Sequence, residues 1–115
     1  MILTDGVFSM DGDLAPLSEL SSLAQAYDCW LMTDDAHGVG VLGAGRGPAV
    51  STENRAADVP LQMGTLSKAI GSYGGYLCSS RNVIDLIRTR ARTFIYSTGL
   101  PPAVVAASIK ALDII

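Results

Sequence analysis

The sequence predicts an α/β protein, and three observations predict it. First, the nearly all-apolar run 29–33, "CWLMT", leads directly into two aspartates, which is typical of a buried strand whose carboxyl end carries polar residues. Second, an apolar helical pattern, formed by Leu17, Leu20, Leu23 and Ala24, precedes that run. Third, short strand-like segments and helical segments alternate through the rest of the chain. Alternation of this kind indicates a sheet that is covered by helices.

The expected elements follow in order along the chain. A strand in 2–10 runs into a turn, and the helix after Gly12 and Pro16 completes the first strand–loop–helix unit. Segment 38–60 has many helix-breaking residues and no sustained period, so it is predicted to be a long loop. The remaining expectations are strands at 61–66 and 74–80, a helix at 81–92, a strand at 93–98, and a helix at 101–115 with proline in its first turn.

Composition excludes several classes of protein. The chain has 115 residues, about one small domain, and 49% hydrophobic with 17% charged residues is typical of a globular protein. A net charge of −3 without a basic stripe argues against a nucleic-acid surface. No segment approaches the ~18 apolar residues that a membrane span needs, and Asp5 interrupts the first apolar run. We therefore expect no membrane segment and a cytoplasmic protein.

The two cysteines, Cys29 and Cys78, lie inside apolar runs rather than at paired loop spacings. This pattern predicts buried free thiols in a reducing compartment, and neither a disulfide framework nor a metal cluster. No metal site is expected elsewhere, because Asp35, Glu53 and Asp58 form no recognisable ligand set around His37.

Segment 38–43, "GVGVLG", matches the dinucleotide fingerprint G-x-G-x-x-G after a candidate strand. The fingerprint requires a helix that starts at the glycines and holds the pyrophosphate at its N-terminus. The following residues, "AGRGPAVSTENR", are poor helix formers, and "DDAH" separates the strand from the glycines. A nicotinamide-binding oxidoreductase is therefore the weaker alternative, and a non-catalytic module is a third possibility.

Three chemically capable residues follow expected strands. Asp34 and His37 come after the buried strand, and Lys68 follows the strand at 61–66 in "MGTLSKAIGSYGGY", among hydroxyl residues and glycines. Open α/β sheets bind ligands at the carboxyl ends of their strands. A lysine amine can form a Schiff base with an aldehyde, an aspartate can keep a pyridine nitrogen protonated, and hydroxyls with backbone amides can cradle a phosphate. Pyridoxal phosphate needs these three functions.

The segments "TDGVFSMDGD", "DDAHGVGVLG", "GTLSKAIGSYGGY" and "YSTGLPP" together resemble the α-oxoamine synthases among the fold-type I pyridoxal phosphate enzymes. The resemblance covers nearly the whole chain, with the four motifs in the family's order. It implies that residues 1–115 are the central part of the large catalytic domain, a three-layer α/β/α structure with a mostly parallel sheet. The family's N-terminal part and C-terminal small domain would then be absent.

The resemblance also implies a role for each candidate residue. Lys68 would carry the cofactor and act as the catalytic base, and Asp34 would pair with its pyridinium nitrogen. His37 would contact the phenolic oxygen. The cofactor-binding set is completed by Ser9 beside the ring, Thr65 at the phosphate and Thr98, which would reach the phosphate of a partner subunit in a homodimer.

The implied reaction is a decarboxylative condensation of L-alanine with a pimeloyl thioester, carried by coenzyme A or by a carrier protein. Other members of the family join other amino acids to other acyl groups, and they remain open as alternatives. The substrates are therefore expected to be an amino acid and an acyl thioester.

Overall fold

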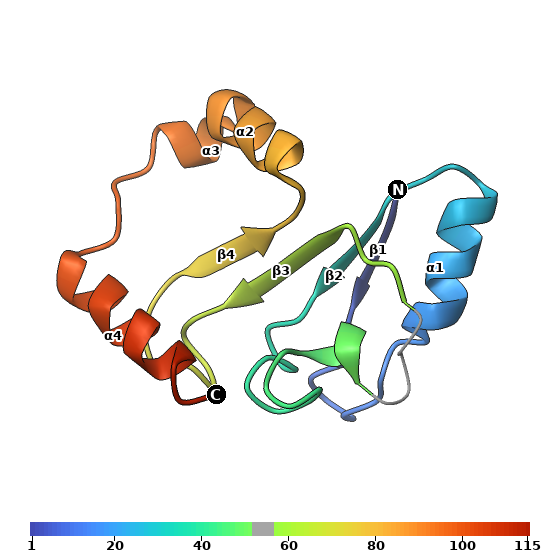
Figure 1. Ribbon diagram of the computed structural model, residues 1–115, viewed down its shortest axis with the longest axis horizontal. Coiled ribbons are helices and arrows are strands. Elements are labelled where there is room, and N and C mark those ends of the chain that lie inside the picture. Colours follow the sequence, from blue (N-terminus) through green and yellow to red (C-terminus); the bar gives the residue numbers. More distant parts are fainter. Residues whose placement is uncertain (52–56) are drawn as a thin grey trace.

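The computed structural model describes residues 1–51 and 57–115. Strands and helices alternate in the first part of the chain, and three helices follow the last strand, as Figure 1 shows. The elements are β1 (Ile2–Asp5), α1 (Leu17–Ala26), β2 (Leu31–Asp34), the 3₁₀ helix η1 (Pro48–Val50), β3 (Leu61–Thr65), β4 (Gly75–Cys78), α2 (Arg81–Arg90), α3 (Arg92–Ile95) and α4 (Pro102–Leu112).

The four strands form one sheet in the order β1-β2-β3-β4. β1, β2 and β3 are parallel, with Asp5 opposite Asp34 and Asp34 opposite Met63. β4 is antiparallel to β3, because the chain turns back directly through the glycine-rich loop after Thr65. The predicted mostly parallel sheet is confirmed, and it places the carboxyl ends of three strands at one edge.

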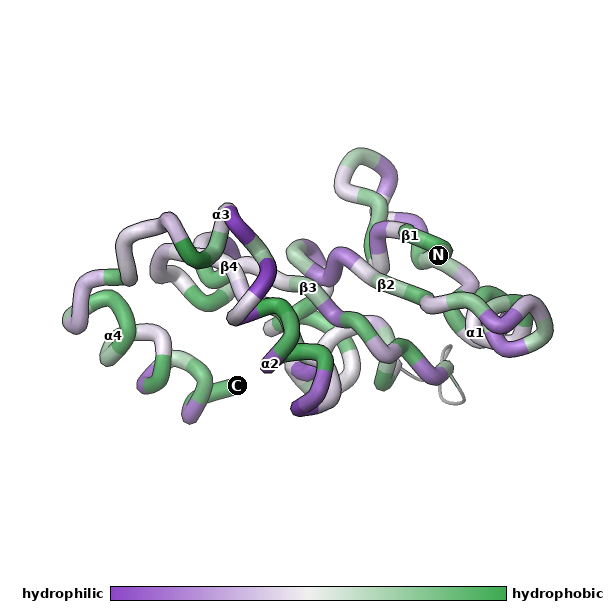
Figure 2. Tube along the Cα trace, turned by 90° about the horizontal axis from the view of Figure 1, so that it is seen from above, coloured by the Kyte–Doolittle hydropathy of each residue, from purple (hydrophilic) through white to green (hydrophobic). Residues whose placement is uncertain are grey.

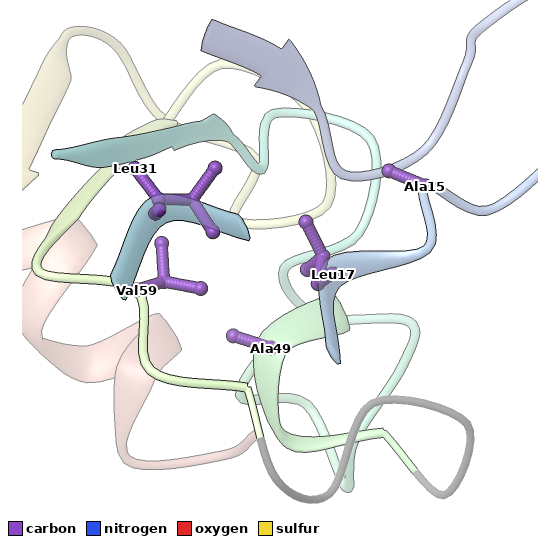
Figure 3. Packing of buried hydrophobic residues seen from close by; sticks show 6 residues of the cluster. Ala15, Leu17, Leu31, Ala49 and Val59 are labelled. Carbon is purple, nitrogen blue, oxygen red and sulfur yellow. The ribbon is translucent and has the colours of Figure 1, made fainter. Parts of the chain in front are cut away.

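The core lies between α1 and the sheet. Leu17 of α1 and Leu31 of β2 are completely buried, and Ala15, Ala49 and Val59 pack around them, as Figure 3 shows. α1 therefore owes its stability to this apolar face, since its N-terminus lacks a side-chain cap. Burying a leucine side chain of this size contributes about 1.5–3 kcal/mol.

α4 lies on the same face of the sheet as α1, but over β4. It forms one wall of an apolar cavity of about 550 Å³. Tyr76 and Cys78 of β4 line the same cavity. Ser108 donates a hydrogen bond to Ser72 Oγ at 2.8 Å, which ties α4 to the loop between β3 and β4. Figure 2 shows that α4 is largely hydrophobic, and Ile109 is 58% exposed.

α2 and α3 lie on the opposite face. They line a second cavity, of about 490 Å³, together with Met63 of β3 and Leu77 of β4. Met63 pairs with Leu77 on the face that α2 and α3 cover. The next pair, Gly64 with Tyr76, points to the other face, where α4 lies. Helices therefore cover both faces of β3 and β4. The arrangement is the expected three layers, and Figure 1 shows β4 between α2–α3 and α4.

Segment 93–98 is a correction to the sequence prediction. Its aromatic and β-branched residues favour a strand, yet Arg92–Ile95 form the helix α3. Among the described strands, none pairs with this segment. Phe94 lines the cavity beside Met63 and Leu77 but stays 60% exposed, so the strand propensity of the segment is not met by any strand partner.

The cysteine prediction is also wrong in part. Both thiols are free, as expected, but Cys78 is exposed and Cys29 is only partly buried. Cys78 ends the edge strand β4 beside the open apolar cavity, so nothing described covers it. The expected long loop is confirmed over its described parts, which contain turns and the three-residue η1.

Candidate active site

The carboxyl ends of β1, β2 and β3 gather most of the predicted site residues. Asp34 ends β2 and Thr65 ends β3. Ser9, His37 and Lys68 lie in the loops that follow β1, β2 and β3, and all three are exposed. The sheet therefore brings five of the six candidates to a single edge, since parallel strands end together.

Asp34 is held by the backbone around it. Its Oδ1 accepts a hydrogen bond from the Ala36 N–H at 2.9 Å, and its main-chain carbonyl accepts one from the Gly6 N–H at 2.8 Å. Among the described residues, Oδ2 accepts no hydrogen bond. A half-exposed carboxylate that keeps one oxygen free at a strand end is suited to pair with a cationic ring nitrogen.

His37 lies in a tight turn directly after β2. The Asp35 carbonyl accepts hydrogen bonds from the Gly38 and Val39 N–H groups at 2.9 and 3.0 Å, and these bonds close the turn. The imidazole is exposed within this turn. His37 can thus face a ligand at the strand edge without being buried in the core.

The loop that carries Lys68 is compact. Leu66 N–H donates to the Gly74 carbonyl at 2.8 Å, Ser72 N–H donates to the Leu66 carbonyl at 2.7 Å, and Gly71 N–H donates to the Lys68 carbonyl at 2.9 Å. Gly71 and Gly74 have φ values of 66° and 116°, which side chains rarely tolerate. The lysine is therefore presented on an ordered loop while its side chain remains accessible.

Thr65 uses its hydroxyl within this loop. Oγ1 donates to the Gly74 carbonyl at 3.0 Å, lies 2.8 Å from Ser67 Oγ and accepts the Ser67 N–H at 3.3 Å. The Ser67 hydroxyl, which the sequence analysis did not single out, is exposed beside it. Because the single proton of the Thr65 hydroxyl is donated to Gly74, the Ser67 hydroxyl is the one left to donate to an anion at the end of β3.

Thr98 is the one candidate that the sheet does not bring to this edge. It is exposed in the connection between α3 and α4. Figure 1 shows this connection at the periphery, away from the carboxyl ends of β1, β2 and β3. Its predicted role in a partner's site stays a prediction.

Asp35, for which the sequence predicted no role, is only 2% exposed. Burial, with a smaller contribution from the charge of Asp34, raises the pKa of Asp35 to about 6, although the nearby Thr33 hydroxyl opposes the shift. Thr33 Oγ1 and Asp35 Oδ1 both lack a hydrogen bond of normal geometry. The only sequence signal for the burial of Asp35 is the apolar run that precedes the two aspartates.

The dinucleotide alternative does not fit the local structure. Residues 38–47 form successive turns, with Gly40 N–H donating to the Gly45 carbonyl and Gly47 N–H to the Leu42 carbonyl. Within 38–51 the only helical element is the three-residue η1, so no helix N-terminus is available to hold a pyrophosphate.

Metal ligands are not grouped in the described parts of the chain. Over residues 1–51 and 57–115, no three His, Cys, Asp or Glu side chains lie together as a metal site requires. Glu53, considered above, lies outside the described residues. In the same ranges, no helix is long and apolar enough to cross a membrane.

The family model for aminotransferase class I and II matches residues 1–115. The chain belongs to this family. Two curated members, both called 8-amino-7-oxononanoate synthase, are similar over all of it: that of Methylocella silvestris is 66% identical, and that of Beijerinckia indica is 64% identical. The chain spans 32% and 30% of their lengths.

Solved structures of the family show the same fold. Serine palmitoyltransferase from Sphingomonas wittichii matches 96% of this chain with a TM-score of 0.88 and 34% identity, and 28% of its own length is covered. A structure of SPT with PLP matches with a TM-score of 0.84 and 32% identity, over 96% of this chain and 28% of that one. The sheet described here is thus a part of the fold-type I architecture.

Proposed function

We propose that this chain is part of a pyridoxal phosphate-dependent acyltransferase that condenses L-alanine with a pimeloyl thioester to give 8-amino-7-oxononanoate. The carrying observation is the set of Asp34, His37, Thr65 and Lys68 at one sheet edge. Identities of 64% and 66% to curated 8-amino-7-oxononanoate synthases support this substrate choice. Biotin synthesis in the cytoplasm is the proposed setting.

The side chains fit pyridoxal phosphate in chemical type. Lys68 Nζ is accessible for a covalent link to an aldehyde carbon, and the free Oδ2 of Asp34 can accept a hydrogen bond from a protonated ring nitrogen. The exposed Ser67 hydroxyl can donate to the phosphate, and Thr65 is proposed to do so after its hydroxyl turns away from the Gly74 carbonyl. His37 is proposed to contact the phenolic oxygen, and Ser9 to lie beside the ring.

When bound, the cofactor supplies an electron sink for the negative charge that develops at the α-carbon of the amino acid. The Asp34 carboxylate stabilises the proton on the ring nitrogen, because an opposite charge nearby favours the protonated form. Lys68 Nζ is the proposed base that takes the α-proton. His37 orients the ring from the turn after β2.

Other α-oxoamine synthase activities are the alternative, because the structural matches include serine palmitoyltransferases as well as an 8-amino-7-oxononanoate synthase. The serine palmitoyltransferases are 34% identical or less in the two structures described above, about half the identity of the curated 8-amino-7-oxononanoate synthases. Assaying the complete protein with alanine or serine, each with pimeloyl-CoA or palmitoyl-CoA, separates the two activities. Turnover of serine with palmitoyl-CoA alone would replace our substrate assignment.

The proposed complete protein is longer than this chain. We propose that residues 1–115 form part of its large catalytic domain, with an additional N-terminal part and a C-terminal small domain. The proposed assembly is a homodimer. Its support is the exposed apolar surface of the C-terminal third, where Phe94 is 60% and Tyr96 is 77% exposed.

Replacement of Lys68 tests the cofactor assignment. In the complete protein, Lys68→Ala is expected to abolish the yellow absorption and the turnover while the fold persists, because the side chain is exposed and its loop is closed by backbone hydrogen bonds. Lys110→Ala, at the exposed end of α4, is the matched control and should keep both. Borohydride labelling on Lys110 instead of Lys68 would overturn the assignment.

Subunit mixing tests the role of Thr98. If each site borrows Thr98 from its partner, a dimer of one Lys68→Ala and one Thr98→Ala subunit holds one doubly altered site and one intact site. Activity should then reappear on mixing two inactive parents. Absence of recovery, with exchange verified, would return Thr98 to a role within its own subunit.

A further inference from the structure

The carboxyl of Asp35 points away from that of Asp34. Successive side chains of a strand alternate between faces, so Asp35 lies on the α1 side of the sheet, whereas Asp34 faces the other side. Asp35 is buried, and its Oδ1 has no hydrogen bond of normal geometry among the described residues, although the nearby Thr33 hydroxyl acts to lower the pKa of the carboxyl. A buried polar atom without a partner is costly, which favours a specific role for this residue.

Two glycines make room for the Asp35 carboxyl. A β-carbon on Gly6, in the loop after β1, would collide with Asp35 Oδ1 and lie 2.8 Å from Pro48 Cγ. A β-carbon on Gly47 would lie 3.4 Å from Asp35 Oδ2. The carboxyl is thus enclosed between the backbone of the loop after β1 and the end of the glycine-rich segment before η1.

The backbone of Asp35 joins further parts of the site. Its N–H donates to the Met63 carbonyl of β3 at 2.7 Å, and its carbonyl accepts the two hydrogen bonds that close the turn around His37. One residue therefore connects β3, the turn with His37, the loop after β1 and the glycine-rich segment.

We propose that Asp35 is a positioning residue whose enclosed carboxyl holds segment 35–47 against the loop after β1, and that it thereby orients Asp34 and His37. The effect of Asp35 on cofactor binding rests on the proposed function. The claim that Asp35 holds segment 35–47 in place does not depend on that function. The role is one of shape, and an uncharged side chain of the same shape fulfils it.

The surroundings of Asp35 agree with this uncharged role. The titratable groups whose charges reach it are Asp34, on its own strand, and Tyr76, which projects from β4 on the same face. None of the described lysines or arginines forms an ion pair with it. Burial is the main cause of the raised pKa of its carboxyl, so the fold favours the neutral acid more than the unfolded chain does, and the neutral form predominates below about pH 6.

Hydrogen exchange of the complete protein without cofactor tests the structural part. Asp35→Ala is expected to raise deuterium uptake in segment 35–47, while segment 81–92 is unchanged. Asp35→Asn keeps the shape and should retain the wild-type uptake. Asp5→Asn, which removes an exposed carboxylate from the end of β1, is the matched control and should also leave segment 35–47 unchanged. Unchanged uptake in Asp35→Ala would overturn the proposal, whatever the cofactor does.

Titration with pyridoxal phosphate, well below the unfolding temperature of every variant, tests the consequence at the site. Asp35→Ala should weaken binding about tenfold, and Asp35→Asn should restore most of it. If Asp35→Ala were less stable but bound pyridoxal phosphate with wild-type affinity, Asp35 would contribute to stability and would not position the site. Failure of Asp35→Asn to restore binding would show that charge is required. If the wild type itself did not bind, the proposed function would fail, and hydrogen exchange would still decide the structural part.

Discussion

The first part of the chain, from β1 to β3, differs from the part after β4 in how it is held together. The hydrophobic core comes from the first part, where Leu17 and Leu31 are fully buried. The second part consists of α2, α3 and α4, whose helices bury a single described residue, Ser108. The first part thus packs on itself, whereas the helices of the second part rest on the sheet with much apolar surface uncovered.

The two parts are therefore stabilised in different ways, the first by a buried core and the second by a few polar contacts. Residues of the first part place Asp34 and His37 by buried packing, which tolerates few changes in volume. Residues of the second part hold their helices by a few polar links and by surfaces open to another chain or another segment. Substitutions should therefore have large effects in the first part and small ones in the second.

The largest effect is expected for Leu31→Ala in β2. Removing a completely buried leucine next to α1 should lower the free energy of unfolding by about 2–5 kcal/mol. The matched change Leu86→Ala, on the exposed side of α2 where the leucine is 58% exposed, should cost about 0.5 kcal/mol or less. Urea unfolding of both variants in the complete protein measures the contrast. Equal losses would contradict the comparison.

The next effect is the dependence of stability on pH through Asp35. Its pKa rises from 3.8 in the unfolded chain to about 6 in the fold, so the folded state holds the proton more tightly. Stability from this group is complete below pH 3.8 and is lost as the pH rises through about 6, by about 3 kcal/mol from the size of the shift.

Asp35→Asn should remove this step from the pH profile of the unfolding midpoint, since the amide does not titrate. Asp5→Asn keeps Asp35 and should preserve the step. A profile that retains the step in Asp35→Asn would assign the titration to another group.

A smaller effect is expected where α4 meets the loop of Lys68. Ser108→Ala removes the hydrogen bonds to Ser72 Oγ at 2.8 Å and to the Val104 carbonyl at 2.9 Å, and should cost about 1 kcal/mol. Ser22→Ala in α1 is the control, because the Ser22 hydroxyl donates only to Ser18 of its own helix and is exposed. Thermal unfolding should show the larger loss for Ser108→Ala.

The smallest effect is expected for the surface ion pair at the end of α4. Lys110 Nζ lies 3.7 Å from Asp113 Oδ2, and both side chains are mostly exposed. Asp113→Asn should change the free energy of unfolding by about 0.5 kcal/mol at most, because solvent screens the pair. A loss as large as that of Ser108→Ala would show that the α4 surface is covered in the complete protein.

Sequence patterns predicted the α/β class and placed Asp34, His37 and Lys68 after strands, whereas the mostly parallel sheet, Ser9 and Thr65 were implied by the family resemblance. The first group depends on local patterns: an apolar run before Asp34, and small and hydroxyl residues around Lys68. Such patterns determine which segments become buried strands and where their polar ends lie, because burial on both faces excludes polar residues from the strand interior.

Tertiary structure alone decided the rest. α3 is a helix, and none of the described strands pairs with segment 93–98 to satisfy its strand propensity. Cys78 stayed exposed because β4 is an edge strand. Asp34 and Asp35 are the same residue type and adjacent in sequence. Asp34 is nevertheless half-exposed, whereas Asp35 is enclosed against Gly6 and Gly47. Their difference arises from the loops that meet only in the folded chain, and no local pattern encodes such contacts.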